Sequence, residues 1–362
     1  MFNPARLLMA RRRRSLTMKA LADRVAVEPR TVSAWESGEF PPKDENLQAL
    51  AQALRFPLDF FSRDNPDEVD PEGVSFRALT KMTARQREAA LSAGAIAFEL
   101  HDWIAERFVL PSPDLLDLRG EDPEIAASTL RRHWKLGDRS IRNMVHLLES
   151  KGARVFSLAE DAREVDAYSL WRGATPFIFL NTLKSAEHNR HDAAHELGHL
   201  VLHKHGAQRG SAVEREADSF AAAFLMPAVT VGAAVSRVPT LTQLVLLKRH
   251  WVVSVASLAY RLHKLGLVSE WHYRSLCIEM SELGYRRREP EEAPRETSQV
   301  LAKVLLALRD DRVTKAVLAE ELAVPVDEIE KIVFGLVVTG LTPISAKQVQ
   351  PRQPTGNLRL VK

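Results

Sequence analysis

Four histidines recur at every fourth position in HDAAHELGHLVLH, residues 191–203. Residues four apart lie one above the other on a helix, so His195 and His199 would present two imidazoles to one point. Zinc accepts two such nitrogens, and Glu196, beside the first of them, can reach a water on the open side of the metal. The stretch therefore predicts a helix that carries zinc ligands, in a site that either cuts a bond or only holds structure.

A third ligand is available in a second predicted helix, VEREADSFAAAFLMP, where Glu214 and Asp218 lie one turn apart. A carboxylate from Glu214 would complete a three-ligand site and leave the fourth position to water. Asp218 would then accept the N–H of a liganding histidine and fix its tautomer. Glu216 is the alternative ligand, but it points about 200° around the helix from Glu214 and has no acid one turn later. HExxH followed by ExxxD is the arrangement of gluzincins, a class of zinc metalloendopeptidases.

The outer two histidines extend the same stripe. Three helical turns span about 16 Å, more than one metal can bridge, so His191 and His203 are expected beside the site, in the core or at the surface. With Glu196 as general base, the predicted chemistry is peptide hydrolysis, because zinc lowers the pKa of bound water and polarises the scissile carbonyl. Tyr168 is a candidate donor to the oxyanion, although a role in the core is the favoured interpretation.

Three segments around these residues carry a family resemblance. AYSLWRGATPFIFLN, RHDAAHELGHLVLH and EREADSFAAAFLMP together resemble the ImmA/IrrE family of metallopeptidase-like domains, over roughly residues 140–230. The resemblance implies that His195, His199 and Glu214 bind zinc and that Glu196 is the general base. Known members cleave or otherwise inactivate helix-turn-helix repressors during stress or phage induction. The family often has an aromatic residue where this chain has His191, which bears on local packing and leaves the ligands intact.

The N-terminal stretch SLTMKALADRVAVEPRTVSAWESGE, residues 15–39, predicts two short helices joined by a tight turn. Thr17 and Glu28 are placed to cap these helices, and Pro29 stands at the first position of the second. The stretch resembles the Cro/C1-type (XRE) helix-turn-helix family, including W-E-S-G-E and the closing L-x-x-L-A-x-A-L-x-x-P that ends at Pro57. Such a motif sets its second helix into the major groove of DNA.

This second resemblance implies which residues contact double-stranded DNA. Bases would be read from Arg30, Thr31, Ser33 and an outward position at Ala34, and phosphates would be contacted by Thr17, Lys19, Lys43 and the run Arg11–Arg14. A bidentate pair of Arg30 with guanine is worth roughly 1–3 kcal/mol of discrimination, and the phosphate contacts would make binding steeply salt-dependent. Met18 departs from the glutamine that is frequent in the family, which bears on base specificity.

The charge distribution agrees with a DNA-binding N-terminus. Residues 1–22 hold six basic side chains and no acid, although the net charge of the whole chain is only +3. This gives a local cationic face. A small helical bundle with a solvated basic face and a protein-binding module are the alternatives. Because helix-turn-helix modules usually read paired half-sites, a homodimer is expected.

The remaining pattern predicts a mainly α-helical chain with a small β-sheet, an α+β fold. Short apolar runs at 153–158 and 176–181 are typical of strands, and residues 83–108 have helical periodicity. An acidic, proline-containing linker is expected at 289–296. The predicted units are a helix-turn-helix domain (1–66), a helical connector (67–130), a zincin-like ImmA/IrrE metallopeptidase domain (131–232), a helical extension (233–290) and a C-terminal helical module (297–345).

The C-terminal module repeats the N-terminal pattern. TKAVLAEELAVPVDEIEKIVFGL has the same order of helix, A-V-x-P turn and helix as the stretch that begins near Thr17. Its second helix carries Asp327, Glu328 and Glu330, which are expected to face outward and would repel phosphate. A structural or partner-binding role is therefore predicted for this module.

Composition restricts the location of the chain. Every long apolar run is broken by a charge or a proline well before 18 residues, so no membrane span is predicted. No apolar segment with a cleavage site follows the basic N-terminus, so no secretory signal is expected. The single cysteine, Cys277, cannot form an intrachain disulfide, which fits a reducing cytoplasm.

These features support functions from different classes. In the first, the chain is a DNA-binding transcriptional regulator whose zinc domain senses a signal or processes a repressor-type protein. In the alternative, it is a zinc endopeptidase whose main role is to cleave a partner repressor or antitoxin in stress, phage or toxin–antitoxin control. A third keeps the fold and uses the metal for structure only. Because both modules share one chain, the first hypothesis is favoured.

Overall fold

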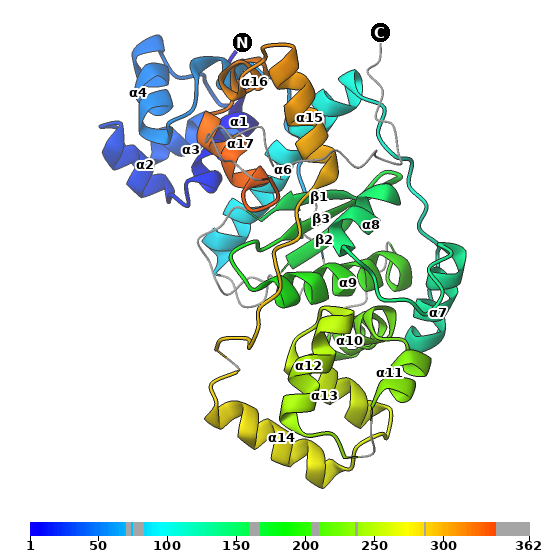
Figure 1. Cartoon of the computed structure of the whole chain (residues 1–362). Coiled ribbons are helices and arrows are strands. Elements are labelled where there is room, and N and C mark those ends of the chain that lie inside the picture. Colours follow the sequence, from blue (N-terminus) through cyan, green and yellow to red (C-terminus); the bar gives the residue numbers. More distant parts are fainter. Residues whose placement is uncertain are drawn as a thin grey trace, which may run out of the picture.

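The computed structural model describes residues 1–69, 74, 83–158, 167–204, 210–235, 238–285 and 287–337. Its mainly helical architecture with one small sheet confirms the predicted fold class. Figure 1 shows the N-terminal helices above the sheet, and a group of helices below it. Residues 338–345, at the end of the predicted C-terminal module, lie outside the described residues.

The N-terminal domain is a bundle of short helices. It consists of α1 (Pro4–Arg13), α2 (Met18–Arg24), α3 (Pro29–Ser37), α4 (Asp44–Leu54) and the 3-10 helix η1 (Leu58–Ser62). Thr17 caps α2 as predicted, by accepting a hydrogen bond from the amide of Ala20. The expected cap from Glu28 is wrong, since its side chain bonds none of the described amides of α3. The start of α3 is set by Pro29, whose fixed φ suits the first turn.

A long helix, α6 (Ala84–Arg107), connects this bundle with the rest of the chain and confirms the helix predicted at 83–108. Thr83 and Gln86 form a capping box at its start. A Cβ atom at Gly94 would lie only 2.7 Å from the Tyr168 hydroxyl oxygen and 2.8 Å from a methyl group of Val69. The glycine inside this helix therefore allows α6 to lie close against the sheet.

Three strands form the sheet, in the order β1-β3-β2: β1 (Arg154–Ser157), β2 (Ala167–Arg172) and β3 (Thr175–Leu180). β1 runs parallel to β3, and β2 runs antiparallel to β3 with Ser169 opposite Ile178. β1 and β3 confirm the two predicted strands. The sequence pattern does not separate β2, which is joined to β3 by a short turn at Gly173, where φ is 59°.

Helices cover the sheet and place the histidines. Helix α9 (Ala186–Leu202) packs on β2 and β3, and α10 (Ser211–Leu225) packs along α9, with α7 (Pro123–His133) and α8 (Met144–Ser150) beside them. Below them in Figure 1 lie α11 (Ala228–Ala234), α12 (Leu241–Trp251), α13 (Val255–Lys264) and α14 (Glu270–Glu282). Among the described residues, no individual helix is long and apolar enough to cross a membrane. By length and composition, only the pair α10 and α11, which is bent by 59°, meets that criterion together.

The acidic stretch predicted as a linker, residues 289–296, is bound to the rest of the protein instead. We call residues 289–298 the strap. The carboxylate of Glu289 lies 3.2 Å from the ammonium of Lys248, whose side chain is 2% exposed. Further along, the carboxylate of Glu296 accepts a hydrogen bond from the backbone amide of Met144. The sequence pattern assigns Glu289 and Glu296 to a solvated linker, but in the structure they bind the buried ammonium of Lys248 and the backbone amide of Met144.

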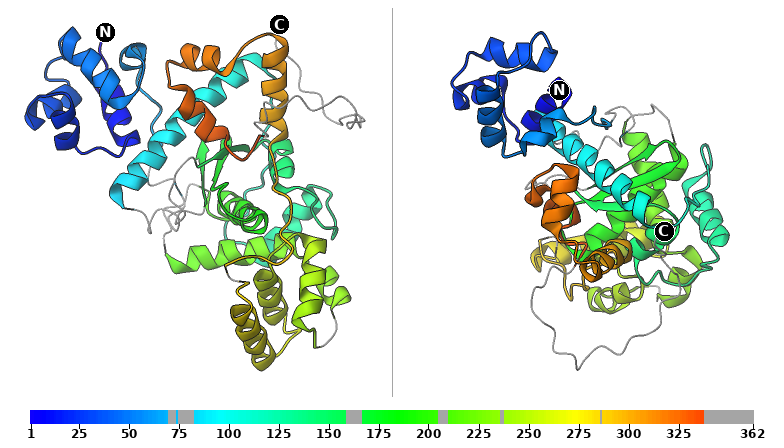
Figure 2. Two further views of the ribbon diagram at one scale, coloured as in Figure 1. Left: turned by 60° about the vertical axis from the view of Figure 1, so that its left-hand side comes forward. Right: turned by 90° about the horizontal axis from the view of Figure 1, so that it is seen from above.

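The strap leads back to the N-terminal half of the molecule. It continues into α15 (Gln299–Asp310), α16 (Lys315–Leu322) and α17 (Val326–Val333), and α16 and α17 contact α6. The indole N–H of Trp103 on α6 donates to the carboxylate of Glu321 at 2.7 Å. Figure 2 shows these helices, in orange, beside α6, and α1 of the N-terminal bundle also contacts α6.

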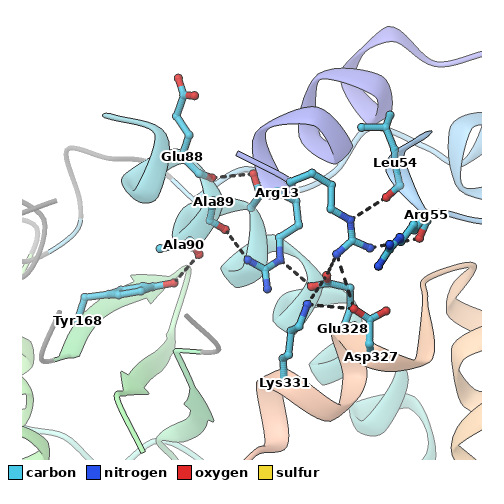
Figure 3. Close-up of polar contacts among 12 residues, drawn as sticks. Arg13, Leu54, Arg55, Glu88, Ala89, Ala90, Tyr168, Asp327, Glu328 and Lys331 are labelled. Carbon is cyan, nitrogen blue, oxygen red and sulfur yellow. Dashed lines mark hydrogen bonds and ion pairs between the residues drawn. The ribbon is translucent and has the colours of Figure 1, made fainter. Parts of the chain in front are cut away.

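One buried carboxylate joins this C-terminal module to the N-terminal domain. Glu328 on α17 is 0% exposed, and it accepts hydrogen bonds from Arg13 at 2.6 Å and from Arg14 at 2.7 Å (Figure 3). The Arg13 guanidinium also reaches the carbonyl oxygen of Ala89 on α6. The prediction that Glu328 faces outward is therefore wrong, whereas Asp327 and Glu330 are about half exposed.

The predicted phosphate contacts of the run Arg11–Arg14 are also wrong for most of the run. Arg11 is buried and donates to both carboxylate oxygens of Glu36, and Arg13 and Arg14 bind Glu328. Buried charges require partners, so a cluster of arginines on a short helix can bind acids inside the protein and need not bind an external ligand.

Candidate metal centre and DNA-binding surface

Helix α9 is buried along most of its length, which fixes where its histidines point. Ser185 caps its first turn by accepting from the amide of His188. A Cβ atom at Gly198 would lie 3.1 Å from the Phe220 ring and 3.3 Å from the Cα of Ala217, both on α10. The glycine within HELGH therefore lets α10 approach α9 closely, and this approach brings the acids of α10 to the histidines.

The structure brings three of the predicted site residues to one point. The Nε2 atoms of His195 and His199 are 3.0 Å apart. The carboxylate of Glu214 lies 3.4 Å from the first and 3.6 Å from the second. Ligand atoms at zinc–nitrogen distances of about 2.0–2.1 Å in a tetrahedron are about 3.3 Å apart, so these spacings fit zinc. Two imidazoles and one carboxylate are also a donor set that zinc uses in catalytic sites.

Asp218 lies where the sequence predicts it. One of its carboxylate oxygens is 2.8 Å from Nδ1 of His195, on the side of the ring away from His199. Burial lowers the pKa of His195, but hydrogen bonds to Asp218 and Glu214 outweigh it and raise the pKa to about 10. The negative charge that favours a proton here would also favour a bound dication.

Glu216 and His203 are placed together, beside the candidate ligands. Glu216 lies 2.9 Å from Nε2 of His203, and Nδ1 of His203 is 3.1 Å from Nδ1 of His199. The alternative third ligand therefore contacts a neighbouring histidine, while Glu214 contacts the pair His195 and His199.

Glu196 is held from the edge strand of the sheet. The hydroxyl of Ser169 on β2 donates to its carboxylate at 2.6 Å. Burial raises the pKa of Glu196 to about 7, although the charge of His195 and the Ser169 hydroxyl act in the opposite direction. A carboxyl group that titrates near neutral pH is suited to accept and return a proton. Ser169 lies in AYSLWRGATPFIFLN, but no pattern in this stretch singles it out, because its contact with Glu196 depends on strand β2, which the sequence pattern does not separate.

Tyr168 belongs to the core, as the favoured interpretation has it. Its side chain is 0% exposed, stacks on Phe179 with ring centroids 4.4 Å apart, and donates to the carbonyl oxygen of Ala90. A donor to an oxyanion at the metal centre has to come from elsewhere.

The expected DNA-reading residues lie mostly at the surface of the N-terminal domain. Lys19, Lys43, Arg30 and Ser33 are exposed, and Thr17 and Thr31 are partly exposed. Ala34 is a correction, since it is buried at 7% exposure. It is rotated by only about 100° around α3 from Trp35, which is itself buried at 1% exposure.

Together, these features define a helix-turn-helix protein fused to a metallopeptidase-like domain of the HExxH type. A family model described as Helix-turn-helix matches residues 7–61, and one described as IrrE N-terminal-like domain matches residues 148–263. The chain is thus a fusion of an XRE-type helix-turn-helix domain with an ImmA/IrrE-type domain, a DNA-binding regulator that carries an IrrE-like module. No curated protein and no solved structure is significantly similar to it.

Proposed function

We propose that this DNA-binding regulator uses a zinc site to cleave a repressor-type protein or an antitoxin. The convergence of His195, His199 and Glu214 on one point carries the proposal, with a separate carboxylate, Glu196, that interacts electrostatically with His195 and Glu214. When bound, zinc supplies Lewis acidity that polarises a peptide carbonyl and lowers the pKa of water. Among the described residues, three offer ligands to this point, and three protein ligands with one position left to water are what catalytic zinc sites use.

The residues of the chain divide the remaining work. Glu196 would accept the proton of the attacking water and return it to the leaving amine, the work of a general base and then a general acid. Ser169 donates to Glu196 and so holds its carboxylate in one orientation. Asp218 accepts the Nδ1 proton of His195, which leaves the Nε2 lone pair of that ring directed at the centre.

Metal analysis tests the site itself. Protein purified and incubated with zinc is expected to hold about one zinc ion per chain, and Glu214→Gln is expected to weaken zinc binding by at least about 100-fold. Glu279→Gln, an exposed acid on α14, is the matched control and is expected to bind zinc like the wild type. A folded wild-type protein that binds no zinc would contradict the proposal.

For the DNA-binding domain we propose that Arg30 reads a guanine at the start of α3 and that a homodimer reads two half-sites. Arg30→Ala is expected to weaken binding to a cognate duplex by about 1–3 kcal/mol, since a bidentate pair with guanine is lost. Gel shifts with duplexes from upstream of its own gene, at several salt concentrations, measure this loss. Arg274→Ala, an arginine on α14 that is 74% exposed at its side chain, is the control. Undiminished binding by Arg30→Ala removes Arg30 from the reading surface.

A further inference from the structure

A second histidine–carboxylate pair lies behind the candidate metal centre. Nδ1 of His199 is 3.1 Å from Nδ1 of His203, and Nε2 of His203 is 2.9 Å from the carboxylate of Glu216. His203 follows the last residue of α9, and its side chain is only 9% exposed, whereas that of Glu216 is 50% exposed. The three groups form a line from the centre to the surface of α10.

The positions of the protons in this line follow from its geometry. A ring nitrogen that binds a cation must present its lone pair, so His199 with Nε2 at the centre carries its proton on Nδ1. That proton needs an acceptor, and Nδ1 of His203 stands at hydrogen-bond distance. The proton of a neutral His203 is then on Nε2, where the Glu216 carboxylate accepts it. Each donor in the line faces an acceptor.

We propose that His203 and Glu216 are positioning residues for the metal centre, an inference that rests on the proposed zinc site. They fix the tautomer and ring orientation of His199, as Asp218 does directly for His195. The Glu216 carboxylate accepts a hydrogen bond from the Nε2–H of His203. His203 in turn accepts the Nδ1 proton of His199, which makes His199 a more basic ligand. Each of the two imidazole ligands then has its own carboxylate, and both carboxylates come from α10.

The stripe of four histidines is thereby divided by role. His195 and His199 face the centre and His203 supports it from the C-terminal end of the helix. His191, at the other end, has its ring centroid 6.4 Å from that of His195, whose Nδ1 is already engaged by Asp218. The equal spacing in the sequence does not distinguish the two outer histidines.

Zinc affinity measured by competition with a chelator tests the proposal without any substrate. His203→Phe removes the acceptor and is expected to weaken zinc binding by about 10–100-fold, the usual effect of losing such a partner. His203→Asn supplies a side-chain oxygen as acceptor and is expected to recover part of that loss. Glu216→Gln keeps an acceptor for His203 but not the charge, and is expected to have a smaller effect than His203→Phe. The absorption spectrum of the cobalt-substituted proteins is expected to shift in the same order.

A control is available on α7, where His133 pairs with Asp114 at 2.6 Å and the pair shares no residue with the metal centre. His133→Phe breaks a pair of the same chemical kind and is expected to leave zinc affinity unchanged. Wild-type affinity in both His203→Phe and Glu216→Gln would overturn the proposal, and equal losses in His203→Phe and His203→Asn would overturn the role of the acceptor. If His203→Phe does not fold, His203→Asn and Glu216→Gln decide. A wild-type protein that binds no zinc would instead refute the proposed zinc site.

Discussion

Glu196→Gln is expected to abolish cleavage of the target protein while zinc binding and DNA binding persist. Glutamine is nearly isosteric with glutamate and still accepts the hydrogen bond from Ser169, but it cannot take a proton from water. Loss of a general base costs about 10²–10⁴-fold in rate. The measurement is the initial rate of cleavage of repressors and antitoxins encoded beside its gene, together with zinc content and gel shifts of the same preparations.

The control and the contradicting result for this variant are specific. Glu279→Gln makes the same chemical change at an exposed site on α14 and is expected to cleave at the wild-type rate. Cleavage by Glu196→Gln at the wild-type rate would refute the assignment of Glu196 as general base. If the variant loses bound zinc together with cleavage, Glu196 is needed for zinc binding, and the loss of cleavage does not report on a general base.

Glu328→Ala is expected to destabilise the junction between the C-terminal module and the N-terminal domain by roughly 3–5 kcal/mol. The reason is that Arg13, with its side chain only 4% exposed, loses a carboxylate that it contacts at 2.6 Å. Arg14 and Lys331, which also face Glu328, keep Asp327 within 3.7 Å and 3.0 Å (Figure 3). Urea unfolding of the whole chain, with hydrogen exchange of α15 to α17, measures the loss and locates it.

Two further variants separate the buried ion pair from surface charge. Glu330→Ala removes an acid of the same helix that is 54% exposed and pairs with Lys315, so its expected cost is about 0–1 kcal/mol. Combining Arg13→Met with Glu328→Met is expected to recover much of the stability, because both buried charges are then removed together. A loss below about 1 kcal/mol in Glu328→Ala would contradict the role given to this carboxylate.

The sequence predicts the elements of this fold wherever a pattern is local. The helix at 83–108, the strands at 153–158 and 176–181, and the Thr17 cap are confirmed. Periodicity and capping depend on residues a few positions apart, which is why they can be read from one segment. The edge strand β2 is not predicted from the sequence, because it is a strand chiefly through its pairing with β3.

In the candidate site, too, local spacing is predictable from the sequence and long-range contacts are not. The i, i+4 spacing alone sets His195 and His199 on one face of their helix, and Glu214 with Asp218 on one face of the next. Their roles as ligands and support remain predictions that metal analysis tests. Which acid meets which histidine depends on how α10 crosses α9 at Gly198, and that crossing assigns Glu216 to His203.

By itself, then, the sequence determined the two modules and the face on which each set of reactive side chains stands, because helical geometry is a short-range property. Only the tertiary structure decided which groups the charged side chains contact. Arg13 and Arg14 meet Glu328 more than 300 positions away, and the acids of the strap meet Lys248 and the amide of Met144. A charged side chain looks the same in a sequence whether it faces water, DNA or a buried partner. The cost of burying it is met only by the groups that the complete fold brings to it.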